Sequence, residues 1–207
     1  MTSRSILPCL ACLCLLALAA PARADDADGG PTLRTAPPLA TAPSAPPDDA
    51  SPDALFARLA IAKDADEADG VVARIDRLNR RSGSDTDDLL LSRATTALDG
   101  EKIDVSLQLL DALVAMNPGW AEAWSVRANA HFDAGDENAA MVDLARALAD
   151  DPRHLKALAD LGAMFENAGR REDALKVYER TLEIAPQWRP VREAADRVRA
   201  ALAGQAL

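Results

Sequence analysis

Cysteine, histidine and aromatic residues are scarce in this sequence of 207 residues. The three cysteines, Cys9, Cys12 and Cys14, lie close to the start, and the chain has two histidines and 3% aromatic residues. So few aromatics argue against a β-sandwich or β-barrel, which depend on aromatic and β-branched residues. The formal charge of −10 gives no support for nucleic-acid binding through a basic surface. Good helix formers make up much of the rest, which predicts an all-α fold.

The first 24 residues have the three-part layout of an export signal. Arg4 precedes an apolar run from Cys9 to Ala20, and Ala22-Arg23-Ala24 forms a small-x-small cleavage site. A membrane-spanning helix needs about 20 apolar residues, so a permanent anchor is the alternative that fits less well. We expect a signal peptide over 1–24, cleaved near Ala24, and a periplasmic mature chain. The cysteines would then be apolar filler within the signal, and the mature chain would have none.

Residues 25–50 are predicted to be a disordered linker rich in proline and alanine. The segment contains six prolines and no aromatic residue, so it cannot bury enough apolar area to offset the entropy of ordering it. The alternative is a proline-rich ligand for a partner, although the segment has no clear core motif for one.

From residue 87 onward the sequence repeats with a period of 34 residues. Pro118, Pro152 and Pro186 have this spacing, and in the same frame small and large residues fall into columns. Small residues would let two antiparallel helices approach closely, and proline would end the second helix of each unit. The small columns are Ala94, Ala128 and Gly162, and Ser106, Ala140 and Ala174; a large column is Leu110, Leu144 and Tyr178.

At these residues the chain resembles the tetratricopeptide repeat family, whose pattern is W-x2-L-G-x2-Y, then A-x3-F, then P. The last unit fits best, with Leu158-x2-Leu161-Gly162-x2-Phe165, then Ala174-x3-Tyr178, then Pro186. The first unit departs most, because Gly100 comes one place earlier than the equivalent glycines, Gly135 and Gly169. The resemblance implies a right-handed α-solenoid of antiparallel helix pairs.

The columns divide the rest of the chain into units. Because such hairpins cannot bury their own apolar faces, both ends of the array need caps. Residues 51–82 are expected to be a degenerate fourth pair, with Ala68, Val72 and Ile75 in the columns of Ala140, Leu144 and Ala147. The other segments are repeat units at 87–120, 121–154 and 155–188 and a capping helix at 189–207.

No catalytic, metal or cofactor site is predicted. Ser92, Ser106 and Ser125 fall on predicted helices with no glycine-rich elbow around them, so none has the setting of a nucleophile. Two histidines in unrelated columns do not make a zinc site. His154 occupies the place that Trp120 and Trp188 hold in neighbouring units, and all three rings are expected to pack at junctions between units.

The resemblance implies that the first helix of each unit lines a concave groove. We expect five acids there against Lys156, above a mild apolar floor, which would suit a basic and apolar peptide or protein segment. The alternative is that this surface is simply solvated. The expected positions are Asp88, Leu91, Thr95, Leu98 and Asp99; Glu122, Ser125, Asn129, Phe132 and Asp133; and Lys156, Ala159, Ala163, Glu166 and Asn167.

The sequence therefore predicts a non-catalytic protein-interaction scaffold in the cell envelope, acting as an adaptor or chaperone-like binder. The alternative is an accessory or regulatory subunit of an envelope enzyme that acts on cell-wall polymer. Neither alternative requires a cofactor, nucleic acid or stable membrane insertion after signal cleavage.

Overall fold

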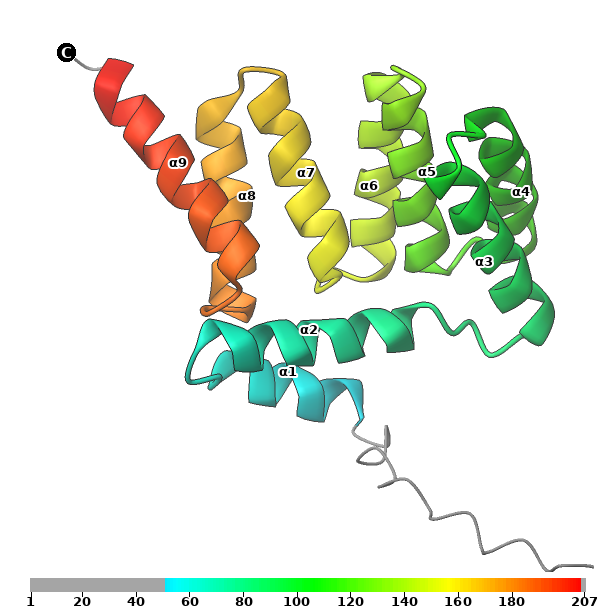
Figure 1. Cartoon of the computed structure of the whole chain (residues 1–207), viewed down its shortest axis with the longest axis horizontal. Coiled ribbons are helices and arrows are strands. Elements are labelled where there is room, and N and C mark those ends of the chain that lie inside the picture. Colours follow the sequence, from blue (N-terminus) through cyan, green and yellow to red (C-terminus); the bar gives the residue numbers. More distant parts are fainter. Residues whose placement is uncertain (1–50, 206–207) are drawn as a thin grey trace, which may run out of the picture. The chain divides into compact units, whose positions relative to one another are not determined.

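The computed structural model describes residues 51–205, so the predicted signal peptide and linker lie outside the described residues. All regular structure in this part of the chain is helical (Figure 1). The helices are α1 (Pro52–Ala60), α2 (Ala65–Asn79), α3 (Asp85–Asp99), α4 (Ile103–Met116), α5 (Ala121–Asp133), α6 (Glu137–Asp150), α7 (Leu155–Asn167), α8 (Arg171–Ile184) and α9 (Arg189–Gln205).

Six of these helices form three antiparallel pairs, α3–α4, α5–α6 and α7–α8, which stack side by side (Figure 1). The small columns lie where the helices of a pair approach, because Ala94, Ala128 and Gly162 are buried. Ser106, in the second small column, donates its hydroxyl to the carbonyl of Ala94 at 2.9 Å. The all-α solenoid of antiparallel pairs that the sequence predicted is thus the observed fold.

The turn inside each pair requires one residue in the left-handed conformation. Gly135 and Gly169 fill this position with φ of 82° and 74°. In the first pair the equivalent residue is Glu101, with φ of 57°. The amide after each of these residues bonds to the carbonyl five residues earlier, at 2.8 to 2.9 Å in all three turns. The displaced glycine therefore leaves the turn geometry intact, although a side chain at positive φ carries strain.

The C-terminal helix α9 covers the exposed side of α8. Its apolar stripe of Val191, Ala194, Ala195 and Val198 is buried in one cluster with Ala174 and Tyr178. The opposite side of α9 is charged and exposed, as expected for a cap that meets solvent.

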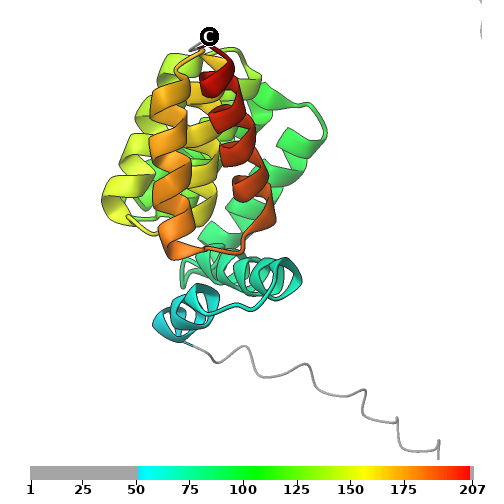
Figure 2. The same cartoon turned by 90° about the vertical axis from the view of Figure 1, so that its left-hand side faces the viewer.

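The helices α1 and α2, called here the N-terminal pair, do not stack on α3. They lie across the starts of the later units, below the array in Figures 1 and 2. Leu59, Val72 and Ile75 pack in one cluster with Leu155, the first residue of α7, and with Ala185, which directly follows α8. The expectation of a fourth unit stacked at the N-terminal end is therefore wrong about position, although Ala68, Val72 and Ile75 are buried as their columns predicted.

Polar contacts explain why the N-terminal pair takes this position. Arg153 binds Asp53 at 2.8 Å and lies over the ring of Phe56. Trp120 donates its indole N–H to the carbonyl of Asn79 at 2.7 Å. The rings that the sequence placed at junctions between units thus lie beside the N-terminal pair as well.

Candidate peptide-binding groove

The predicted groove belongs to α3, α5 and α7, the first helices of the three pairs. The predicted groove residues all lie on these helices. Three of them are nevertheless buried, because Leu91 packs in the core, Glu122 is 3% exposed and Ser125 is 0% exposed. Leu91, Glu122 and Ser125 therefore cannot form the open groove surface for which the sequence suggested them.

Glu122 belongs to a buried polar cluster beneath the N-terminal pair. Its carboxylate accepts from His154 Nε2 at 3.1 Å and lies 3.6 Å from Arg80. His154 Nδ1 accepts the amide of Ala157 at 3.2 Å, so the ring hydrogen is on Nε2 and points to Glu122. The cluster holds the start of α7 against the starts of α5 and of the α2–α3 loop.

The pKa of Asp76, on α2 beside this cluster, is raised. Burial is the main cause, and the negative charge of Glu122 adds to it, whereas His154, Lys156 and Arg80 lower the pKa. Asp76 was not among the predicted site residues. The repeat columns do not identify Asp76, because the charges that affect it, on Glu122 and His154, belong to other units.

The middle of the groove carries a polar triad from α5 and α7. Lys156 binds Asp160 at 2.9 Å. With its amide oriented to satisfy both neighbours, Asn129 accepts from Lys156 at 2.9 Å and donates to Asp160 at 3.1 Å. Asp160 was missed by the sequence analysis, although its spacing of four residues from Lys156 is the usual signal for an ion pair along a helix.

The end of the groove near α9 is neutralised. Glu166 accepts two hydrogen bonds from Arg197, both at 3.0 Å, and one from the Tyr178 hydroxyl at 3.2 Å. The hydrogen bonds from Arg197 lower the pKa of Glu166 despite some burial. Burial, with the nearby Glu166 charge, raises the pKa of Tyr178 to about 12, so its hydroxyl keeps its proton.

These pairings correct the predicted charge of the groove. Of the five predicted acids, Glu122 and Glu166 are paired, and Asp88 accepts from the amide and hydroxyl of Ser82, both at 2.7 Å. Asp99 and Asp133 are exposed and form no ion pair with any residue in the described range 51–205. The open acidity of the groove therefore lies at these two residues.

The remaining predicted residues form a partly exposed strip. Leu98, Phe132 and Ala159 are half-buried against the cores of successive units, and Ala163 is exposed. Thr95 lies at the first unit and uses its hydroxyl to bond the Leu91 carbonyl at 2.9 Å. It also lines a hollow of about 340 Å³ on α3, together with Asp88 and Asp99.

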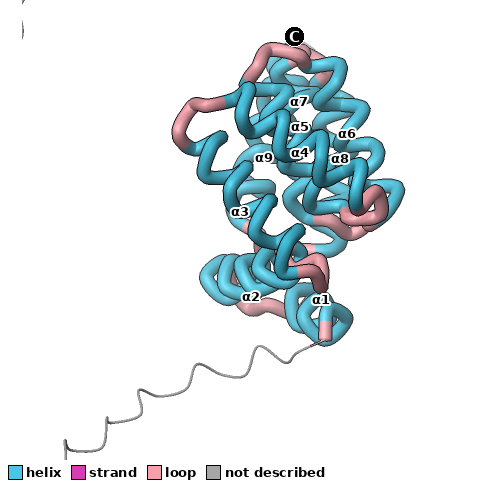
Figure 3. Tube along the Cα trace, turned by 90° about the vertical axis from the view of Figure 1, so that its right-hand side faces the viewer, coloured by secondary structure: helices cyan, strands magenta, loops and turns pink. Residues whose placement is uncertain are grey.

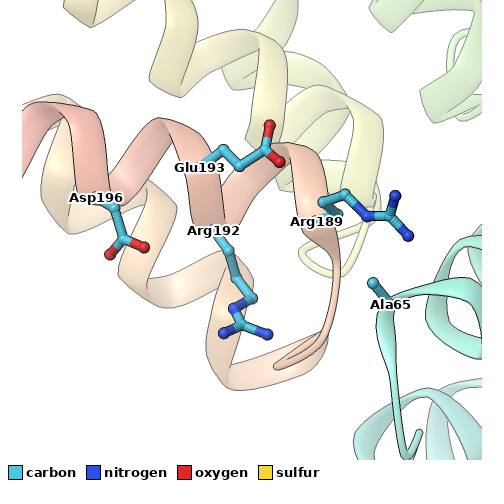
Figure 4. Close-up of a pocket in the computed structure, with 5 residues that line it drawn as sticks. All are labelled: Ala65, Arg189, Arg192, Glu193 and Asp196. Carbon is cyan, nitrogen blue, oxygen red and sulfur yellow. The ribbon is translucent and has the colours of Figure 1, made fainter.

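A second hollow, of about 300 Å³, separates α9 from the start of α2. Its walls are Arg189, Arg192, Glu193 and Asp196 of α9 with Ala65 of α2 (Figure 4). Arg189 extends toward α2, where it forms ion pairs with Asp66 and Asp69. These contacts attach the N-terminal pair to the C-terminal cap and do not resemble a catalytic arrangement.

Two of the serines that the sequence analysis considered, Ser106 and Ser125, are buried. The Ser106 hydroxyl bonds a backbone carbonyl, and the buried Ser125 hydroxyl has no hydrogen-bond partner. No group of three or more potential ligands within residues 51–205 could hold a metal ion. No helix in the same range is long and apolar enough to span a bilayer.

Stacked antiparallel helix pairs that contact their neighbours along the chain define a helical repeat protein. A model of the tetratricopeptide repeat matches residues 131–203. A tetratricopeptide repeat-containing protein of Rhizobium etli is 34% identical over 152 residues, which cover 73% of this chain and 74% of that protein. The chain belongs to the tetratricopeptide repeat family.

Other similarities cover shorter parts of the chain. The PEX5-related protein of Homo sapiens is 30% identical over 87 residues, which cover 42% of this chain and 14% of that protein. The first repeat domain of Spaghetti (RPAP3), bound to an HSP90 peptide, matches with a TM-score of 0.53 at 24% identity, covering 56% of this chain and 91% of that one. MamA matches with a TM-score of 0.53 at 21% identity, covering 65% and 78%. The last two show the fold alone.

Proposed function

We propose that the chain is a non-catalytic scaffold that binds an extended peptide or protein segment along α3, α5 and α7. The observation that carries this proposal is the partly exposed apolar strip of Leu98, Phe132, Ala159 and Ala163 on the three successive helices. This strip runs beside polar groups that are already oriented by one another. A peptide could bury its apolar side chains on the strip without first reordering the groove, which lowers the entropic cost of binding.

The two open acids favour a basic residue in the ligand. Asp99 ends α3 and Asp133 ends α5, so both lie where the helix dipole adds partial negative charge. A cationic side chain at this end of the groove would gain from both sources of potential. The first repeat domain of Spaghetti (RPAP3) binds the HSP90 peptide SRMEEVD, but the acidic residues of such a peptide would meet the wrong charge here.

The test uses an array of immobilised peptides that vary in net charge and apolar content, probed with the purified chain. We expect retention of basic, apolar peptides, with binding reduced about fivefold or more by Phe132→Ala and by Asp99→Asn combined with Asp133→Asn. Val142→Ala is the matched control, because Val142 is 67% exposed on α6 outside the groove. Unchanged binding by folded groove variants would remove the groove from the proposal.

We also infer that this scaffold works in the periplasm as an adaptor or chaperone-like binder. The support is the sequence of residues 1–24, with its apolar run and small-x-small site. Fractionation of the producing cell, with mass spectrometry of the mature N-terminus, tests the inference. A periplasmic chain beginning near Asp25 is expected, and a cytoplasmic chain that keeps residues 1–24 would contradict it.

A further inference from the structure

The end of the array formed by α3 and α4 is not covered by any other described helix. On α4, Leu107 and Val114 pack in the cluster shared with α5, and Asp111 binds Arg127 of α5 at 3.1 Å. The side of α4 that carries these residues therefore faces the second unit. Val105 and Met116 lie on the opposite side, which points away from the rest of the array.

The 34-residue period identifies the corresponding side of α3. Ala123, Val126 and Ala130 of α5 are buried against the first unit. The residues one period earlier are Leu89, Ser92 and Thr96, and all three are exposed. They occupy the positions that the chain uses for stacking at its next junction. We call the surface formed by these three residues, Arg93, Val105, Leu109, Ala112 and Met116 the uncovered face.

This face gathers exposed apolar side chains. Five large apolar residues in the described range are exposed, and Leu89 (51%), Val105 (47%) and Met116 (56%) belong to the uncovered face. Arg93 is its one ionisable residue. Scattered apolar residues on a surface are ordinary, but a group on a face built for stacking indicates an interface.

The chain's own N-terminal pair does not reach this face. It is held beneath the array by Arg153–Asp53, Trp120–Asn79 and the ion pairs of Arg189. Figure 3 is drawn from the side on which α3 and α4 stand in Figure 1, and α1 and α2 lie below them. The covering that a preceding repeat would give is therefore absent within residues 51–205.

We propose that the uncovered face binds the same face of a second copy of this chain, forming a two-fold dimer. The opposite end of the array excludes head-to-tail stacking, because the outer side of α9 exposes Arg192, Glu193, Asp196 and Arg199, which would be costly to desolvate against an apolar surface. Two uncovered faces, in contrast, are both apolar. A two-fold dimer buries both of them and leaves neither exposed for further association.

Such a dimer would place the same two helices, α3 and α4, on both sides of the two-fold axis. Leu89 on α3 and Met116 on α4 would find apolar partners across the axis. This inference does not depend on what the groove binds, because Leu89, Val105 and Met116 are not among the groove residues.

The test is the mass of the full chain by analytical ultracentrifugation over a range of concentrations. We expect the wild-type mass to approach that of two copies as concentration rises. Leu89→Glu combined with Met116→Glu should shift the chain to a monomer, with at least a tenfold weaker self-association. Glu at 89 lies four residues before Arg93, an arrangement that supports the helix, and circular dichroism checks that the fold is kept.

The matched control is Ile61→Glu combined with Val142→Glu. It adds the same charge at two residues that are 78% and 67% exposed and lie outside the uncovered face. This control should associate as the wild type does. A monomeric wild type would overturn the proposal, whether the face stays open or is filled by the chain's own residues 25–50. A dimer that survives in the Leu89 and Met116 variant, or is lost equally in the control, would also overturn it.

Discussion

In each repeat unit, a small residue of the first helix packs near a large residue of the second helix, and their sizes compensate for each other. Ala94 shares a core cluster with Leu110, and Ala128 shares one with Leu144. In the third unit glycine replaces alanine and the larger Tyr178 replaces leucine. A Cβ atom on Gly162 would lie 2.3 Å from Tyr178 Cε1 and 2.6 Å from Cδ1. Gly162 is therefore required by the close approach of the Tyr178 ring.

We predict that Gly162→Ala lowers the free energy of unfolding by about 1–3 kcal/mol, because a buried ring cannot move aside without repacking. Tyr178→Leu is also destabilising, since it loses packing and the hydrogen bond to Glu166. The double variant restores the alanine and leucine of the other units, so it should be less destabilised than the sum of the two. Urea unfolding of the four proteins measures this coupling.

Gly70→Ala provides the control. Gly70 is exposed on α2, and a Cβ atom there would have no neighbour within 4 Å. The substitution should stabilise the chain by about 0.5–1 kcal/mol through helix propensity alone. Additive effects of Gly162→Ala and Tyr178→Leu would show that the two columns do not compensate.

At the scale of the helix, the sequence predicted those features that follow from the 34-residue period. The three pairs, the buried columns and the stripe of α9 follow from local spacing, because neighbouring units repeat one packing pattern. The location of the N-terminal pair could not be found in this way. Two of its ion pairs join residues that are 100 and 123 positions apart, Asp53 with Arg153 and Asp66 with Arg189, and no column relates these positions.

The groove shows the same division. The residues predicted for it lie on α3, α5 and α7. The period could not reveal that Glu122 is buried beneath the N-terminal pair or that Arg197 of α9 neutralises Glu166. Both differences come from segments outside the repeats, whose charges meet the repeat units only in the folded chain.

The helix α2 carries two acids whose pKa values move in opposite directions, which predicts opposite effects of pH. Burial raises the pKa of Asp76. Its protonated form is favoured in the folded chain, so the stability it contributes is present below its unfolded pKa and is lost as pH rises through the folded pKa. Asp76→Asn should therefore raise the free energy of unfolding at pH 7, and the gain should shrink toward pH about 4.

The pKa of Glu67 is lowered in the folded chain, so its effect on stability has the opposite pH dependence. Hydrogen bonds from the Lys63 amide and from Arg58 lower its pKa, so its contribution is present above the unfolded pKa and is lost as pH falls through the folded pKa. Glu67→Gln should destabilise the chain at pH 7 and have little effect in acid. Chemical denaturation of both variants against the wild type at the two pH values measures these differences. Effects of equal sign would contradict the role of burial at Asp76.

At the scale of the whole described chain, the N-terminal pair changes how a repeat array holds together. In a simple solenoid each unit contacts only its neighbours, so a local defect affects the adjacent units. Here one helix pair touches the starts of α5, α7 and α9 through Trp120, Leu155 and Arg189. These starts are separated by 34 residues each in sequence, and the N-terminal pair links their stability.

We predict that Leu59→Ala, at a fully buried residue of α1, increases hydrogen exchange at the starts of α5, α7 and α9 as well as in α1 and α2. The cavity should cost about 2–5 kcal/mol, and the loosened pair would then release all three helix starts. Leu110→Ala is the matched control, because Leu110 is equally buried but lies in α4. It should raise exchange in α3, α4 and α5 and leave α9 unchanged. If exchange rises only in α1 and α2 of the Leu59 variant, the N-terminal pair does not stabilise the rest of the array. If the pair does stabilise the three helix starts, loosening it must increase exchange at all of them.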